Sequence, residues 1–282
     1  MNPTAGAIRA GWTRGLIELR QSFTNAADLW GHFFWPVLML AVMFFMRDTA
    51  FGSSGLLLGT LALPSILGMN VALGMVSMSQ QLTAEREDGT LLRAKATPNG
   101  MRGYLVGKVV SVSGILLADL AIFLIPGMFI IPGLAIGSPG SWPALIWVLA
   151  LGMAAALPIG AVLGSVFTSA RSQGLITLPL LGMIAISGIF YPITSMPEWL
   201  QWIAQIFPFY WLGLGMRSAL LPDAAVGVEI GESWRHLETI GVLGAWAVLG
   251  VILAPIVLRR MARGESGSSV AKRREKAVQR VG

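Results

Sequence analysis

The chain has 282 residues, of which 55% are hydrophobic and only 12% are charged, with a formal net charge of +6. Soluble globular domains carry about 25% charged residues, so the composition excludes an ordinary soluble domain and indicates a polytopic membrane protein. The chain has no cysteine, which excludes disulfides and thiol chemistry.

Long stretches with little or no charge predict the membrane-spanning helices, because crossing about 30 Å of hydrocarbon takes roughly 20 mostly apolar residues. Two spans share the segment between Lys108 and Arg171, whose only charge is Asp119, with IPGLAIGSPGSW as the turn between them. The first stretch lacks a small-residue cleavage site, so we expect it to be a span and not a signal peptide. We predict an all-α fold with six spans, near 30–46, 56–79, 104–131, 142–168, 173–191 and 237–258.

The basic residues predict the orientation, because Lys and Arg are retained on the cytoplasmic side of a membrane. Three lie before the first span, five between Gln80 and Lys108, one at Arg171 and eight in the tail, which places 17 of the 20 on one side. Both termini are therefore expected in the cytoplasm. The basic balance does not predict nucleic-acid binding, because no aromatic stacking platform is interleaved with it.

Three segments are expected to flank the spans without crossing the membrane. Residues 1–29 hold an amphipathic interfacial helix with its arginines toward lipid phosphates, and 259–282 form a basic tail near anionic head groups. Residues 192–220 form a helical hairpin broken at Pro208 and dipping into the outer leaflet; the competing interpretation, a seventh span, would put the tail outside. The interfacial helix has Ile8, Trp12, Leu16, Leu19 and Phe23 on its apolar face and Arg9, Arg14, Glu18 and Arg20 largely elsewhere.

Candidate chemistry within the spans is sparse. His32 and His236 are predicted at opposite membrane faces, so they cannot share a metal, and GYLVGKVV lacks the spacing and the Ser or Thr of a phosphate-binding loop. Asp119 either lines a translocation route or relays a proton, or it is structural and either pairs with a hydroxyl or amide such as Asn70 or is protonated. A small-residue stripe is expected to let a neighbouring helix approach closely, at Gly152, Ala156, Gly160 and Gly164.

The most informative segment is the cytoplasmic loop 80–103, which holds six charged residues between Glu85 and Lys95. We expect the second span to continue through QQLTAERED and to break at Gly89. Thr90 is then expected to cap a short helix with two exposed leucines, and Thr97-Pro98 to end it. A short charged knob of this kind suits docking into a groove on a partner.

The loop resembles that of a known family. EREDGTLLRAKATP, followed by a Tyr and a Gly-Lys pair, resembles the cytoplasmic loop of the type-2 ABC exporter permeases. SGIFYPITSMPEWLQWIAQIFPFYWLGLGMRSAL is similar to that family's stretch after its fifth span. The resemblance covers nearly the whole chain and is greatest to the drug and antibiotic-resistance (daunorubicin-resistance-like) branch.

The resemblance implies a permease in the bacterial plasma membrane that pairs with a second permease copy, with two separate ATP-binding subunits below. ATP and Mg²⁺ would bind those subunits, and this chain would bind no cofactor and catalyse no reaction. A coupling element is implied, formed by Glu85, Arg86, Glu87, Gly89, Thr90 and Leu91.

The function predicted is export of a hydrophobic or amphipathic compound, such as a drug, an antibiotic or a lipid-like molecule. The alternatives are export of a lipid-linked glycan, a membrane-embedded lipid-modifying enzyme, and a scaffold or immunity protein that binds a partner through the loop. The enzyme needs a carboxylate, histidine or metal cluster at one membrane face, which the sequence does not reveal.

Overall fold

A computed structural model describes residues 3–50, 57–166 and 170–264, and these residues are mostly helical. Two prolines mark local boundaries: Pro208 is the first residue of α9, and Pro192 precedes a short 3₁₀ turn. The helices are α1 (Pro3–Ser22), α2 (Ala26–Met46), α3 (Leu58–Glu87), α4 (Thr90–Lys95), α5 (Gly100–Ile130), α6 (Ser141–Val166), α7 (Ala170–Ile186), α8 (Glu198–Ile206), α9 (Pro208–Leu220) and α10 (His236–Gly264), with 3₁₀ turns η1 (Ile193–Ser195), η2 (Asp223–Val228) and η3 (Ile230–Glu232).

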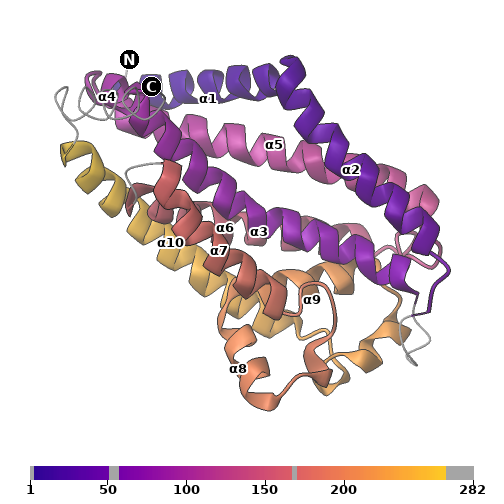
Figure 1. The fold of residues 1–282 in the computed structure, drawn as a ribbon. Coiled ribbons are helices and arrows are strands. Elements are labelled where there is room, and N and C mark those ends of the chain that lie inside the picture. The colour runs from indigo at the N-terminus through magenta and orange to yellow at the C-terminus, as the bar shows by residue number, and fades with distance from the viewer. Residues whose placement is uncertain (1–2, 51–56, 167–169, 265–282) are drawn as a thin grey trace.

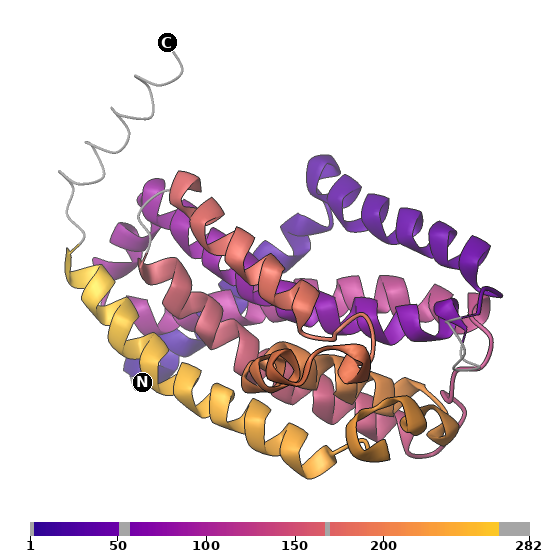
Figure 2. The ribbon, with the colours of Figure 1, turned by 60° about the horizontal axis from the view of Figure 1, so that its bottom comes forward.

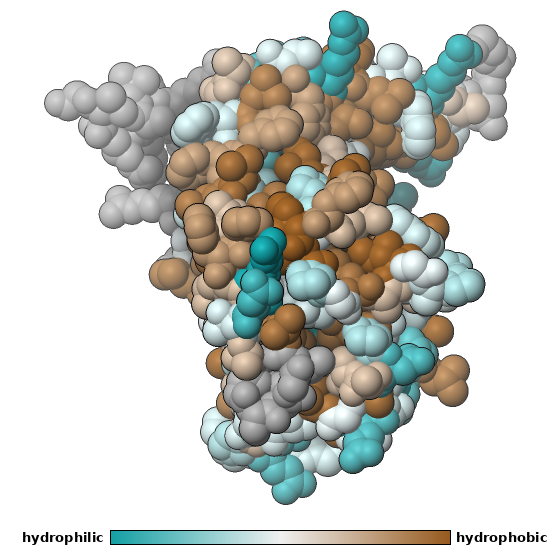
Figure 3. Space-filling model, turned by 90° about the vertical axis from the view of Figure 1, so that its right-hand side faces the viewer, coloured by the Kyte–Doolittle hydropathy of each residue, from teal (hydrophilic) through white to brown (hydrophobic). Residues whose placement is uncertain are grey.

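The long helices form a bundle around α3, which contacts α2, α5, α6, α7 and α9 (Figures 1 and 2). In the most apolar part of α3, 72% of the residues are buried, against 17% in α2 and 22% in α10. The outer helices expose large apolar side chains instead, and apolar residues cover much of the face in Figure 3. Such a surface is stable in lipid and not in water.

Within the described residues, five helices are long and apolar enough to cross a membrane: α2, α3, α5, α6 and α10. The chain is therefore a multi-pass membrane protein. The predicted span 173–191 corresponds to α7, whose 17 residues extend about 25 Å. This helix ends at Ile186, five residues early, and Gly188 turns the backbone with a φ of 73°. A side chain at Gly188 would collide with Ile193, so the chain can turn here only because the residue is glycine.

The predicted tail is also corrected at its start, because α10 continues to Gly264, six residues beyond the expected end at 258. Met261 and Ala262 are buried in this extension, and Leu258 just before it packs in a cluster with Leu91 of α4. Packing against α4 therefore keeps the chain helical past Arg259 and Arg260. The rest of the predicted tail lies outside the described residues.

The small-residue stripe of α6 faces helices of the same chain. Gly160 and Gly164 lie against the backbone of α3 at Met75 and Ser79, and Gly152 lies against Leu212 of α9 and Val71 of α3. Ala156 is also buried in this core. Helices approach this closely only where side chains are small, so α3 and α6 form the rigid centre of the bundle.

The segment after α7 forms two short helices of different character, at the end of the bundle opposite α4 (Figure 1). α8 ends at Ile206 and α9 begins at Pro208, and almost every residue of α9 is buried against α3, α6 and α10. By contrast, α8 exposes a row of apolar side chains: Trp199, Trp202, Ile203 and Ile206.

A buried ion pair that the sequence did not predict fixes α9 to the following turns. The fully buried Arg217 donates from Nε to Glu229 Oε1 at 2.6 Å and from Nη2 to Oε2 at 3.4 Å. Its Nη1 donates to the carbonyl oxygens of Gly188 and Ile189. The guanidinium thereby joins the end of α7, α9 and the segment after η2, and its charge is compensated where no water reaches it.

A glycine substitution tests the close packing of α3 and α6. Gly160→Ala places a Cβ against the Met75 carbonyl, and overpacking of this kind costs about 1–3 kcal/mol of unfolding free energy. Gly244→Ala is the matched control, because nothing lies within 4 Å of the Cβ position at Gly244 on α10. We expect thermal unfolding of the purified protein to show a lower Tm only for Gly160→Ala, and equal Tm values would contradict the packing.

Candidate functional site

The short helix α4 is formed by local backbone signals. Gly89 adopts a φ of 82°, which breaks the helix at the end of α3, and Asn99 adopts a φ of 55° before α5. The expected cap at Thr90 is wrong: Thr90 is the first helical residue, and its backbone N–H donates to Asp88 Oδ1 at 2.7 Å. A carboxylate accepts this bond better than a hydroxyl does and also favours the positive helix end.

The prediction of two exposed leucines on α4 is also wrong. Leu91 is only 1% exposed and packs in an apolar cluster with Met78, Tyr104 and Leu258. Transfer of this side chain out of water anchors α4 onto α3, α5 and α10. The exposed surface is instead polar or small, and it consists of Asp88, Arg93, Lys95, Ala96, Thr97, Pro98 and Asn99.

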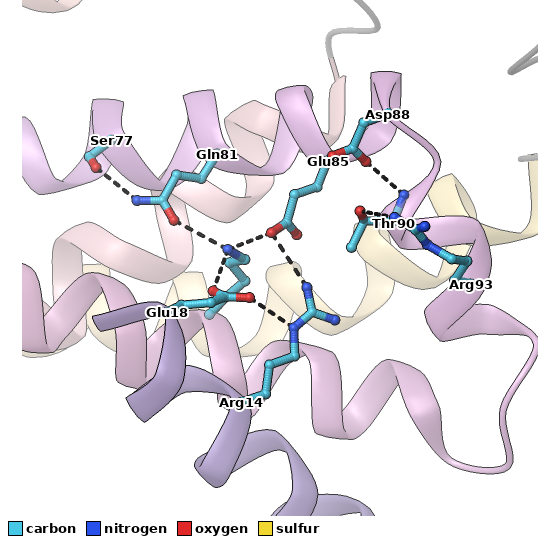
Figure 4. A network of polar contacts seen from close by, with 9 residues as sticks. Arg14, Glu18, Ser77, Gln81, Glu85, Asp88, Thr90 and Arg93 are labelled. Atoms are coloured by element: carbon cyan, nitrogen blue, oxygen red, sulfur yellow. Dashed lines mark hydrogen bonds and ion pairs between the residues drawn. The ribbon is translucent and has the colours of Figure 1, made fainter. Parts of the chain in front are cut away.

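Behind α4, the ammonium of Lys108 holds two carboxylates from two other helices. Lys108 Nζ lies 2.6 Å from Glu85 Oε1 of α3 and 2.8 Å from Glu18 Oε2 of α1, and donates to Gln81 Oε1 at 3.3 Å. Figure 4 shows Glu18, Gln81 and Glu85 pointing toward one point between the helices. The Lys108 side chain is only 5% exposed, so water cannot replace these partners.

A second cation closes the group, which we call the Lys108 cluster: Arg14, Glu18, Gln81, Glu85 and Lys108. Arg14 Nε donates to Glu18 Oε1 at 2.8 Å, and its Nη2 lies 3.6 Å from Glu85 Oε1. The cluster has two positive and two negative groups and is electrically balanced. Burial opposes ionisation of Glu18, but the hydrogen bonds from Lys108 and Arg14 outweigh it and lower the Glu18 pKa below its ordinary value of 4.5.

The interaction of Arg14 and Glu18 with the cluster corrects the expected arrangement of α1. These two side chains point toward α3 and α5 and not toward lipid phosphates. The helix lies along α5 (Figure 1), where Gly11 and Gly15 meet the backbone of Gly103 and Gly107. Its outward surface holds Ile8, Trp12, Leu16 and Ile17, all exposed, which suits a helix with one face on protein and one face in lipid.

The six predicted coupling residues therefore divide into anchoring and outward positions. Glu85 and Leu91 point into the protein, and Arg86 Nη1 donates to the Ser165 carbonyl of α6 at 3.3 Å. Glu87, Gly89 and Thr90 are half-buried at the turn. A groove of about 520 Å³ lies beside this turn, between α1 and α4, and Arg14, Arg93, Ala94 and Tyr104 are among its lining residues.

The predicted pair Asp119 and Asn70 lines one small cavity between α5 and α3. The two side chains do not bond each other: Asp119 Oδ1 lies 2.6 Å from Nδ1 of His32 on α2, and Asn70 donates to the Ile66 carbonyl. Nε2 of His32 in turn lies 2.7 Å from the Ser22 hydroxyl. His236 lies at the start of α10 beside Trp147, away from this group.

Comparison with known families gives a direct assignment. A family model described as "ABC-2 family transporter protein" matches residues 46–256. The chain belongs to the ABC-2 transporter family. It is accordingly a membrane component of an ABC transporter, and family membership implies association with an ABC ATP-binding subunit. A search of curated proteins finds no significant match.

The sequence of this ABC-2 family member did not predict the contacts that Lys108 makes behind α4. The Gly-Lys pair at 107–108 is part of the family motif, but the motif does not predict that its lysine pairs with Glu85 and Glu18. A signal was present, because a lysine at the start of an apolar span must find a carboxylate partner or reach water. Within the described residues, no three His, Asp or Glu side chains are grouped in a way that would hold a metal ion.

Removing the central cation tests the Lys108 cluster. Lys108→Met leaves Glu18 and Glu85 close together with one cation fewer, and breaking a buried pair in this way costs about 3–5 kcal/mol of unfolding free energy. Lys108→Met with Glu85→Gln restores the charge balance and should recover part of the loss. Arg47→Met, which removes an exposed pair with Asp48, should cost about 0–1 kcal/mol. Chemical unfolding measures all three, and a tolerated Lys108→Met would contradict the cluster.

The lowered pKa of Glu18 predicts a defined pH dependence. A carboxyl whose pKa is lower in the folded state stabilises the fold above its ordinary pKa, and this contribution is lost as the pH falls through the folded value. Glu18→Gln should therefore lower the Tm by its full amount at pH 7, and the difference from wild type should shrink below about pH 4.5. The exposed Asp223→Asn is the control. A difference that is constant across this range would exclude the linkage.

Proposed function

We propose that this chain is the permease subunit of an ATP-driven exporter that moves a hydrophobic or amphipathic compound out of the bacterial cell. Two permease copies pair, and two separate ATP-binding subunits dock beneath them and bind the ATP and Mg²⁺. The α4 end of the bundle faces the cytoplasm, together with both termini. In this arrangement α7 is the fifth of six spans, α8 and α9 form the outer hairpin, and α10 is the sixth span.

The observation that carries this proposal is the construction of α4. The buried Leu91 anchors α4 to the bundle, and Glu85, two residues before the end of α3, is joined to α1 and α5 through Lys108. The opposite surface of α4 is exposed and polar. A helix that is rigidly attached on one side and open on the other is suited to transmit force from a docked subunit.

The cargo class follows from the surfaces that the spans offer. The described helices expose aromatic and aliphatic side chains, among them Trp30, Phe33 and Phe45 of α2. A compound that partitions into lipid can approach along such surfaces. We therefore favour drug, antibiotic or lipid-like cargo, as in the drug-resistance branch, over a lipid-linked glycan.

Co-purification with the ATP-binding subunit encoded nearest to this gene tests the function. The complex should form in detergent, and its ATP turnover should rise several-fold over that of the isolated ATP-binding subunit. A scaffold or immunity protein would show no such stimulation. Absence of both binding and stimulation would overturn the exporter assignment.

A charge reversal on α4 tests the docking surface. Arg93 is exposed and bonds only locally to the Thr90 hydroxyl, so Arg93→Glu should leave the fold intact. We expect at least a tenfold loss of stimulated ATP turnover, because like-charge contacts at an interface cost several kcal/mol. Arg20→Glu, an exposed arginine at the far end of α1, is the matched control. Equal effects of the two variants would exclude a docking role for α4.

A second candidate function rests on a specific observation. Ser22, His32 and Asp119 are hydrogen-bonded in the order of a nucleophile, a base and an orienting carboxylate, at 2.7 Å and 2.6 Å. A hydrogen-bonded histidine and carboxylate are part of what a lipid-modifying enzyme would need. A fluorophosphonate probe that labels wild type but not Ser22→Ala would favour the enzyme, and unlabelled protein would remove it.

A further inference from the structure

The cavity that contains Asp119 is formed by one face of each of two helices. Residues spaced by three and four positions meet from both sides, which is the spacing of a single helical face. The cavity is about 100 Å³ and is lined by Asn70, Leu73, Gly74 and Ser77 of α3 and by Val112, Ile115, Leu116 and Asp119 of α5. It therefore lies between the central helix and α5, with three polar side chains in an apolar wall.

The polar groups in this wall are mainly acceptors. The Asn70 amide N–H donates to the Ile66 carbonyl at 3.0 Å, and the Ser77 hydroxyl accepts from Gln81 at 3.3 Å. His32 holds only Oδ1 of Asp119. Within the described residues, no hydrogen bond uses Asp119 Oδ2 or Asn70 Oδ1. A carboxylate oxygen and an amide oxygen are thus left to accept from a donor that enters the cavity.

Charge complementarity identifies the donor as a cation. In the tautomer in which the Ser22 hydroxyl donates to Nε2 of His32, the ring donates from Nδ1–H to Asp119, and an ionised Asp119 keeps its negative charge. The nearest lysine on α5 is Lys108, which Glu18 and Glu85 already occupy and which lies three helical turns, about 16 Å, away. A carboxylate whose charge no cation compensates is costly in an apolar span, so a cation bound beside Asp119 Oδ2 would be stabilised.

The size of the cavity limits what part of a ligand can enter. About 100 Å³ holds roughly the volume of three waters, enough for an ammonium or methylammonium group and too small for a whole drug. The remainder of such a molecule must lie outside the cavity, against apolar helix surfaces or lipid. This requirement selects a molecule with a small cationic end and an apolar body.

We propose that the cavity between α3 and α5 is a recognition subsite for the ammonium group of an amphipathic cation, with Asp119 as its counter-ion and Asn70 as a second acceptor. The subsite deepens the proposed function, on which it rests, because the amphipathic cation is then the exported cargo. His32 is a positioning residue that orients the carboxylate without contacting the ligand.

A matched pair of probes tests the subsite on the permease alone. The probes are a dansyl-labelled primary alkylamine, cationic at pH 7, and its uncharged N-acetyl analogue, and dansyl fluorescence reports binding to full-length protein in nanodiscs of neutral phosphatidylcholine. Wild type should bind the amine at least tenfold more tightly than the analogue. Asp119→Asn should abolish this preference and leave binding of the analogue unchanged. Asp48→Asn removes an exposed carboxylate at the opposite end of α2 and should keep the preference.

A second variant protects the test against misfolding. Asn70→Leu keeps the volume of the side chain and the His32–Asp119 contact, and it should reduce the amine preference several-fold. Equal affinity of wild type for the two probes, or an undiminished preference in both Asp119→Asn and Asn70→Leu, would overturn the subsite.

The outcome is separable from that of the proposed function. A permease that stimulates its ATP-binding subunit but does not prefer the amine retains the exporter function and loses the subsite. Amine preference without any association with an ATP-binding subunit gives the reverse result.

Discussion

The Lys108 cluster is the constraint on which the α4 end of the molecule depends. Its ammonium is almost fully buried, so its two carboxylate partners must come from the protein, and they come from different helices, Glu18 on α1 and Glu85 on α3. The three helices cannot separate here without leaving a buried charge unpaired. Since Glu85 is two residues from the end of α3, the position of α4 is tied directly to this cluster.

The rigidity established by the cluster continues along α3. Gly160 and Gly164 of α6 bring the backbones of α6 and α3 together without intervening side chains. At the opposite end, α9 is buried against both helices, and Arg217 ties it to Glu229. In the proposed exporter, a displacement of α4 would therefore be passed along α3 and would not be absorbed in a loop.

Periodicity and charge in the sequence predicted where the helices lie along the chain better than they predicted the contacts between those helices. Uncharged stretches located the long helices, and Gly89 and Pro98 bounded α4, because span length and backbone conformation are local properties. Contacts between distant residues were missed: the burial of Leu91, the inward direction of Arg14, and the Arg217–Glu229 pair. A helical face can be read from sequence spacing, but whether it meets protein, lipid or water depends on residues far along the chain. The shorter α7 illustrates this, since its end depends on Gly188 meeting Ile193.

The helices are attached to α3 with different firmness, and this difference suggests which of them would move together. α1 and α5 are joined to α3 by paired charges and close glycine contacts. By contrast, α2 is mostly exposed, and within the described part of the chain one side-chain hydrogen bond, between His32 and Asp119, links it to α5. When α3 and α5 move together, the strain falls on this contact, because the bonds in the Lys108 cluster are more numerous and less accessible. Separation of His32 from Asp119 would change which groups pair with the carboxylate in the α3–α5 cavity. In the proposed exporter, a movement at α4 would thus alter the cation affinity of the proposed subsite through ordinary helix displacement.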